Sequence, residues 1–252
     1  MNYFFTISNS NYKCNLTIPR FQNRGSIDHK QELFSANIYK DEWIIKKEKV
    51  ENDNFFYFIE KEYIEDEAIY FLSEQDLHNT KLSALDLNNN FLLTDPAFRA
   101  NLRIENKAGG FSSYQSEYPS SMVKNRGNIL SQVSSLSNIS SNENFLFFKN
   151  IYTQPIYKSF QVYIIDILNE RILFEKEFYT NKLNYLEIEK NLINPNNFFF
   201  SNGFLGIPVY YMENNGGISL EHTHPLQTYI MSQDRNKIIK GLKENAKKII
   251  SR

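Results

Sequence analysis

The chain has a single cysteine, Cys14, among its 252 residues. One thiol cannot form a disulfide within the chain, so nothing suggests an oxidising compartment. The segment from Met1 to Thr6 lacks the basic start and long apolar run of a secretory signal. No stretch approaches the roughly 20 apolar residues that a membrane-spanning helix needs. We therefore expect a cytoplasmic protein with no membrane partner.

An excess of charge of either sign is also absent. The chain has 28 Lys and Arg against 29 Asp and Glu, which gives a net charge of -1. A protein that holds nucleic acid through its overall field is usually strongly basic. The sequence therefore predicts no nucleic-acid partner and leaves a small ligand, a protein partner or a second copy of the chain.

Complete signatures of a known chemistry are missing as well. The sequence has no Gly-x-Ser-x-Gly elbow, no His-Glu-x-x-His zinc motif, no cysteine pair and no acidic calcium-binding loop. Whether the protein is an enzyme stays open at this level.

Aromatic residues, in contrast, are abundant, with 21 Phe and 16 Tyr. Such side chains bury large apolar areas, so the chain can build a substantial core. The many Asn, Lys and Ile residues are typical of an AT-rich genome and indicate a microbial or viral source.

Most of the readable segments are short and rich in strand-forming residues. The runs 55–59 and 68–72 are too short for helices and contain mainly aromatic and β-branched residues. Residues 98–104 alternate between apolar and polar, which predicts a half-buried strand. Two hairpins are expected, one joining 160–168 to 171–179 and one around the loop 213–217.

One helix is clearly predicted, at the C-terminus after Asp234. Its apolar stripe contains Ile238, Ile239, Leu242, Ala246, Ile249 and Ile250, and its other face carries lysines. A basic amphipathic helix can lie on a membrane surface or on a partner, but this stripe has no Trp or Phe. We therefore favour a helix packed on the body of the protein.

The stretch 131–144 is dominated by Ser and Asn and is typical of a linker or a long surface loop. It predicts an N-terminal β-rich domain at 1–142 and a C-terminal β-sandwich domain with the helix at 143–252. The expected fold class is mainly β, with two β-sandwich-like halves and a C-terminal amphipathic helix.

The most specific candidate site is the pair His222 and His224. On a strand, residues two apart face the same side, so both imidazoles could bind one transition metal. A third protein ligand is not evident, because no histidine follows His224. The pair can equally hydrogen bond at a strand end, or serve a ligand pocket without metal.

A second candidate is the segment 106–128, which reads as a long loop rich in hydroxyl groups. Tyr114 and the cations Arg99, Arg103 and Arg126 could bind a sugar, a phosphate or a carboxylate. The plain alternative is a polar surface hairpin.

Three functions therefore stay open. The leading hypothesis is a non-catalytic binding or assembly protein that recognises a carbohydrate-like or acidic ligand, or a protein partner, without a cofactor. The first alternative is a metal- or His-dependent enzyme centred on His222 and His224. The second is a self-assembling virion or filament component, which would act as a homo-oligomer.

Overall fold

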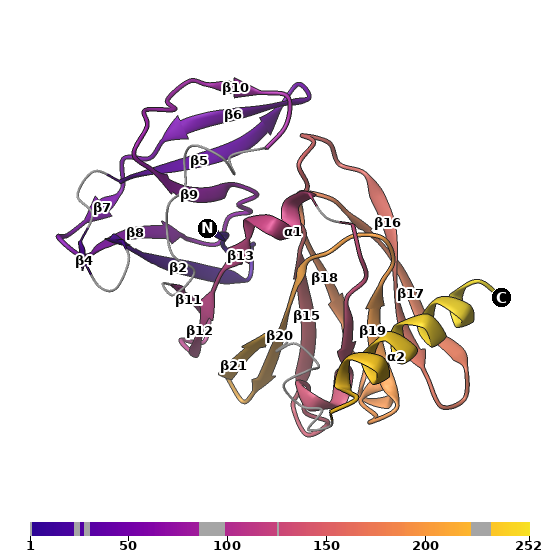
Figure 1. Ribbon diagram of the computed structural model, residues 1–252. Coiled ribbons are helices and arrows are strands. Elements are labelled where there is room, and N and C mark those ends of the chain that lie inside the picture. Colours follow the sequence, from indigo (N-terminus) through magenta and orange to yellow (C-terminus); the bar gives the residue numbers. More distant parts are fainter. Residues whose placement is uncertain (1, 23–25, 28–30, 86–98, 125, 223–232) are drawn as a thin grey trace.

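The computed structural model describes residues 2–22, 26–27, 31–85, 99–124, 126–222 and 233–252. The protein is mainly β, with 49% of these described residues in strands and 12% in helices. Four sheets of four or five strands contain most of the strand residues, and two short pairs of strands contain the rest. Figure 1 shows the first two sheets on one side of the molecule and the last two on the other.

Sheets 1 and 2 come from the first half of the chain. In spatial order, sheet 1 contains β10 (Lys81–Leu82), β6 (Glu42–Lys47), β5 (Glu32–Tyr39) and β9 (Ile69–Ser73). Sheet 2 contains β12 (Phe111–Ser116), β11 (Ala100–Asn106), β2 (Tyr12–Pro19), β8 (Phe56–Lys61) and β7 (Glu51–Asn52).

Sheets 3 and 4 come mainly from the second half. Sheet 3 contains β18 (Leu183–Glu187), β15 (Glu143–Lys149), β20 (Ile207–Asn214) and β21 (Gly217–His222). Sheet 4 contains β14 (Leu130–Gln132), β19 (Asn197–Ser201), β16 (Ser159–Asp166) and β17 (Arg171–Tyr179).

The remaining elements are short, apart from the last helix. Strand β1 (Asn2–Tyr3) pairs with β13 (Tyr118–Pro119), and β3 (Phe21–Gln22) pairs with β4 (Ser26–Ile27). The helical segments are α1 (Ser120–Lys124), two 3₁₀ turns at Val133–Ser135 and Lys190–Leu192, and α2 (Arg235–Ile250).

The predicted strands and hairpins are confirmed among the described residues; Phe98, the first residue of the predicted strand 98–104, lies outside them. Along β11 the residues alternate between buried and more exposed, as a strand with one covered face requires. The β20–β21 turn is tighter than predicted and consists of Asn215 and Gly216, with φ of 50° and 83°. Positive φ at both central residues is the signature of a type I′ turn, which Asn-Gly favours.

The prediction of two sandwich-like halves is wrong, because the four sheets form a four-bladed, propeller-like ring. Sheet 3 belongs to two cores at once. Its Phe147 and Tyr211 side chains join a core with residues of sheets 1 and 2, whereas Phe148 and Tyr210 face sheet 4. A sheet buried on both faces cannot be half of an isolated sandwich. The run 145–148 is apolar at every position for this reason.

Sheets 2 and 3 also meet edge to edge at β12 and β21. The Leu220 amide donates to Ser112 Oγ at 3.0 Å, and Asn106 Nδ2 donates to the Gly216 carbonyl at 3.1 Å. A Cβ on Gly110 would lie 1.8 Å from the Gly216 oxygen, so this approach requires glycine at position 110.

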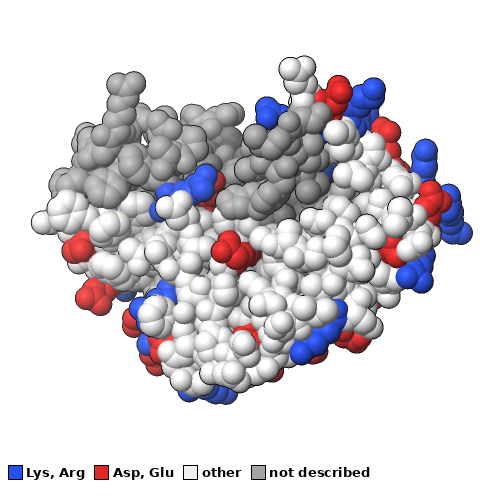
Figure 2. Space-filling model, turned by 90° about the horizontal axis from the view of Figure 1, so that it is seen from below, with Lys and Arg blue, Asp and Glu red and all other residues white. Residues whose placement is uncertain are grey.

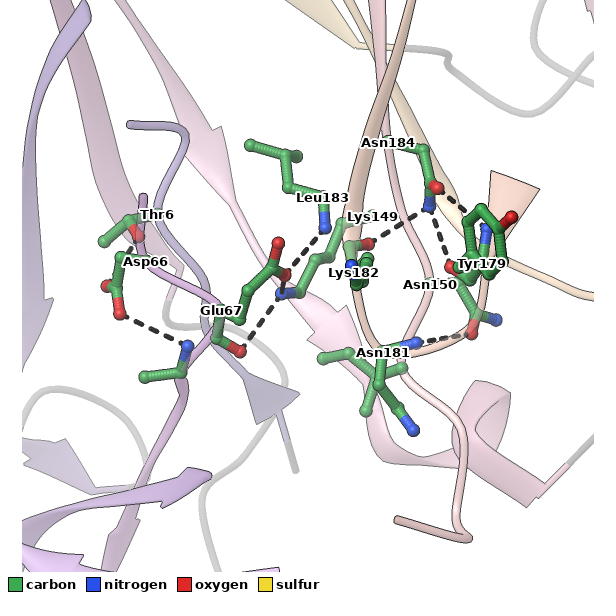
Figure 3. A network of polar contacts seen from close by, with 12 residues as sticks. Thr6, Asp66, Glu67, Lys149, Asn150, Tyr179, Asn181, Lys182, Leu183 and Asn184 are labelled. Atoms are coloured by element: carbon green, nitrogen blue, oxygen red, sulfur yellow. Dashed lines mark hydrogen bonds and ion pairs between the residues drawn. The ribbon is translucent and has the colours of Figure 1, made fainter. Parts of the chain in front are cut away.

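A charged contact links sheet 3 to the segment before β9. The fully buried Lys149 side chain extends toward Glu67, with 3.4 Å between Nζ and Oε2 (Figure 3). The same Glu67 oxygen accepts a hydrogen bond from the Leu183 amide at 2.8 Å. One carboxylate therefore joins the N-terminal part of the chain to two strands of sheet 3.

The domain boundary at residue 142 stays a prediction. The stretch 131–144 is not a linker throughout: β14 pairs with β19 in sheet 4, and Ser131 Oγ lies 2.8 Å from Tyr210 Oη in the core. A Ser-rich sequence can thus be buried when its hydroxyl groups find partners.

Helix α2 is confirmed and packs on the body of the protein. Its Ala246 and Ile249 lie against Tyr163, Ile165 and Phe200 on the outer face of sheet 4. Figure 1 shows α2 lying across this sheet. In the part of the chain that the structure describes, no helix is long and apolar enough to cross a bilayer.

Candidate ligand-binding face

The five predicted site residues that the structure describes do not converge. Arg99 is exposed and pairs with Glu117 at 3.3 Å, and Arg126 lies over the Phe204 ring at 5.7 Å. Neither of these two contacts involves Tyr114 or His222.

Tyr114 and His222 do lie together, with their ring centroids 5.4 Å apart. Tyr114 faces the core, where burial raises the pKa of its phenol. The group therefore stays protonated near neutral pH and is not a base there. His222 ends β21 and is half-buried, whereas His224 lies outside the described residues.

The metal prediction for His222 and His224 stays untested. Among the residues that the structure describes, no three His, Cys, Asp or Glu side chains form a cluster that could hold a metal ion. The single thiol, Cys14, is fully buried, and burial raises its pKa to about 12, so it is protonated and shielded.

The segment 106–128 is not a long loop: it begins with the β11–β12 turn and goes on through β12, β13 and α1. Strands β11 and β12 pair from Ala100–Ser116 to Glu105–Phe111, which leaves a short turn between them. In this register Tyr114 lies opposite Leu102 on the buried face, and Arg103 lies opposite Ser113 on the outer face. Arg103 and Tyr114 therefore belong to different sides of sheet 2.

The outer face of sheet 2 contains a hollow of about 600 Å³. The register of the sheet explains its composition. One row across four strands consists of Ser113, Arg103, Asn15 and Glu60, each directly opposite the next. These side chains share one face because neighbouring positions in adjacent strands point the same way.

The neighbouring row adds Asn101, Thr17 and Phe58, again as direct cross-strand partners. Phe56 stands next to Phe58 on β8, with their ring centroids 6.3 Å apart, and both are half-buried. On the other side of the hollow, Phe111 is 59% exposed. Aromatic rings thus flank a polar row on both sides.

Arg103 connects the polar row to Phe111. Its guanidinium carbon lies 3.9 Å from the centroid of the Phe111 ring, and Nη2 is 3.5 Å from Glu105 Oε2. A guanidinium stacked on an aromatic face is held in place by a cation–π contact.

Two polar atoms in this row are buried without a hydrogen-bond partner. They are Asn15 Oδ1 and Arg103 Nε, and the two residues are direct cross-strand neighbours. An unpaired buried polar group costs about 1–3 kcal/mol, so such atoms are few in folded proteins and call for an explanation.

Of the predicted site residues that the structure describes, Arg103 alone lines this hollow. Sequence reasoning missed Asn15 and Phe58, although the alternation at 12–18 marks Lys13, Asn15 and Thr17 as members of one outer face. Which strands lie beside that face depends on the sheet order β11-β2-β8, which pairs segments far apart in the sequence.

Charges are mixed on the surface that Figure 2 shows: described Lys and Arg side chains alternate with Asp and Glu, and no large area carries one sign. Comparison with models of known protein families, with curated protein sequences and with solved structures finds no match. What this chain does must therefore be inferred from its own geometry.

Proposed function

We propose that this chain is a binding protein whose outer face of sheet 2 holds a carbohydrate. The observation that carries the proposal is the polar row of Arg103, Asn15 and Glu60 between Phe56 and Phe58 on one side and Phe111 on the other. Sugars present apolar C–H faces and polar hydroxyl edges, so aromatic rings beside hydrogen-bonding groups suit both.

The size and the charge of the hollow favour a small polar ligand. A hollow of about 600 Å³ falls within the usual range of small-molecule sites, about 300–1,000 Å³. The core of a protein–protein interface, in contrast, is depleted of charged residues. Here Arg103 and Glu60 stand in the central row, which favours a polyhydroxylated ligand over a protein partner.

The rigid sheet explains how binding would work. All contributing side chains come from β12, β11, β2 and β8, which are hydrogen bonded in register. A preformed face loses little conformational entropy when a ligand binds. The role we propose is non-catalytic: the aromatic and hydrogen-bonding contacts of this face would hold a ligand, and the proposal includes no chemical step.

The first test is a glycan array with the full chain, followed by calorimetry on the oligosaccharides that bind. Phe58→Ala and Phe111→Ala should each weaken binding about 2- to 12-fold, as expected for the roughly 0.5–1.5 kcal/mol of an aromatic contact. Tyr39→Ala is the matched control, because Tyr39 is 60% exposed but lies on β5 of sheet 1.

Thermal melts should show that all three variants are folded. The proposal fails if no oligosaccharide binds, or if Phe58→Ala and Phe111→Ala bind as tightly as Tyr39→Ala.

A further inference from the structure

We infer that the carbohydrate is an extended oligosaccharide, which runs across the strands of sheet 2 and contacts the aromatic rings at both ends of the hollow. This inference rests on the proposed function and adds the length of the ligand.

The first step is the distance between the two aromatic ends. One row across β8, β2, β11 and β12 consists of Phe58, Thr17, Asn101 and Gln115. Neighbouring strands are about 4.8 Å apart, so Phe58 and Gln115 are about 14 Å apart along this row. Phe111 lies four residues before Gln115 on β12, which adds about 14 Å along the strand. The backbones at Phe58 and Phe111 are therefore about 20 Å apart.

The second step is that one continuous hollow joins these ends. Phe56 and Phe58 of β8 and Phe111 of β12 all line it, although β2 and β11 lie between the two strands. The Arg103 guanidinium covers one face of the Phe111 ring, and Phe111 is still 59% exposed. A single small sugar cannot reach from one end to the other, whereas a chain of several sugar units can.

The third step is where the hydrogen-bonding groups lie. The exposed polar side chains that line the hollow are Asn101, Ser113 and Glu60, on three different strands. Asn15 Oδ1 and Arg103 Nε are shielded from solvent, so the exposed side chains provide the ligand contacts. Hydrogen-bonding groups that are spread over β11, β12 and β8 suit the hydroxyl groups of successive sugar units. A compact ligand would need polar groups that converge on one point.

The consequence is a strong dependence of affinity on chain length. Once one end of the chain stacks on Phe58, the contact with Phe111 forms within the same complex and costs no further loss of translational freedom. Affinity should therefore rise as sugar units are added until the chain reaches both rings, and then stay constant.

The test uses the full chain and linear oligosaccharides of glucose, mannose, galactose and N-acetylglucosamine, each from the disaccharide to the hexasaccharide. Calorimetry gives the dissociation constant and the number of ligands per chain. In the series that binds, the hexasaccharide should bind at least about 10-fold more tightly than the disaccharide, with one hexasaccharide per chain.

Variants at the two ends show whether one ligand contacts both. Phe58→Ala and Phe111→Ala should each weaken hexasaccharide binding about 2- to 12-fold. At most one of the two should weaken disaccharide binding by such a factor, because a disaccharide reaches one ring only. Tyr39→Ala should leave both dissociation constants unchanged, because Tyr39 lies on sheet 1.

The outcomes distinguish this inference from the proposed function. The inference is wrong, and the proposed function stands, if the disaccharide binds as tightly as the hexasaccharide. The same holds if both substitutions weaken disaccharide binding equally, or if only one of them weakens hexasaccharide binding. If no carbohydrate of any length binds, or if neither substitution weakens binding, both are wrong.

Discussion

Individual residues on the outer face of sheet 2 give the clearest functional signal in this protein. Arg103 could be predicted as a site residue because it alternates with buried Leu102 and Ile104 along the strand. That Arg103 lies beside Asn15 could not be predicted, because the two positions are 88 apart in the sequence (103 minus 15). Only the pairing of β2 with β11 brings them together. Sequence alternation identifies a face, and the pairing of strands identifies neighbours.

Glu143 carries a prediction at the same scale. It lies directly opposite Glu213, and burial together with the charges of Glu213 and Glu187 raises its pKa. A carboxyl with a raised pKa favours the folded state only while protonated, so this contribution is lost as pH rises through the folded-state pKa.

Glu143→Gln should therefore stabilise the fold at neutral pH. It should have no stabilising effect below pH 4.5, the ordinary pKa of a Glu carboxyl in the unfolded chain. Glu143 is exposed, so solvent screening limits the gain to about 0.2–0.5 kcal/mol. Urea unfolding across the pH range measures it, with Glu189→Gln, in an exposed position, as control. A variant less stable than wild type at neutral pH would contradict the account.

At the scale of helices and strands, the composition and the hydrophobic periodicity of a segment predict its secondary structure and the side that is buried. The helix 235–250 follows from its apolar stripe. Leu242, Ala246, Ile249 and Ile250 of that stripe contact sheet 4, whereas Ile238 is exposed. Strands β8 and β9 follow from the β-branched and aromatic content of the runs 55–59 and 68–72. The hollow could not be foreseen, because Phe56 and Phe58 look like core residues until their sheet is known to have an open side.

The packing of helix α2 on sheet 4 predicts that alanine substitutions on its two sides differ in their effect on stability. Ile249 is 4% exposed against sheet 4, whereas Ile238 on the same helix is 41% exposed. Ile249→Ala should lower the free energy of unfolding by about 2–4 kcal/mol because it leaves a cavity. Ile238→Ala should change it by less than about 1 kcal/mol.

Both variants replace isoleucine by alanine in one helix, so differences in helix propensity cancel. Chemical denaturation followed by circular dichroism gives the comparison. Equal losses in the two variants would mean that α2 does not pack on sheet 4 in solution.

The whole molecule depends on contacts that join distant parts of the chain. The two-sandwich expectation fails because β15 presents aromatic residues on both faces, and each face has its own neighbours. Trp43 of sheet 1 likewise donates through Nε1 to the Thr153 carbonyl beyond β15, at 2.9 Å. Such contacts are invisible in a sequence that is read segment by segment.

Substitutions of Glu67 and Lys149 test whether the contact between the N-terminal part of the chain and sheet 3 stabilises the fold. Glu67→Gln keeps the shape of the side chain but leaves the Lys149 ammonium without its counter-charge in a fully buried position. Breaking a buried pair costs about 3–5 kcal/mol, and partial exposure of Glu67 reduces this to about 2–3 kcal/mol.

The double variant Glu67→Gln/Lys149→Met should recover more than half of that loss, because no buried charge remains unpaired. Denaturant unfolding of wild type, both single variants and the double variant completes the cycle. Additive effects of the two substitutions would show that the pair does not interact.

The central claim is that the outer face of sheet 2 is where a ligand binds. The most direct measurement is a titration of isotope-labelled protein with a neutral oligosaccharide selected on the array, followed by amide chemical shifts. We expect saturable changes concentrated on β2, β8, β11 and β12, around Asn15, Phe58 and Arg103. Changes concentrated around His222 on β21, or no changes at saturating oligosaccharide, would contradict the claim.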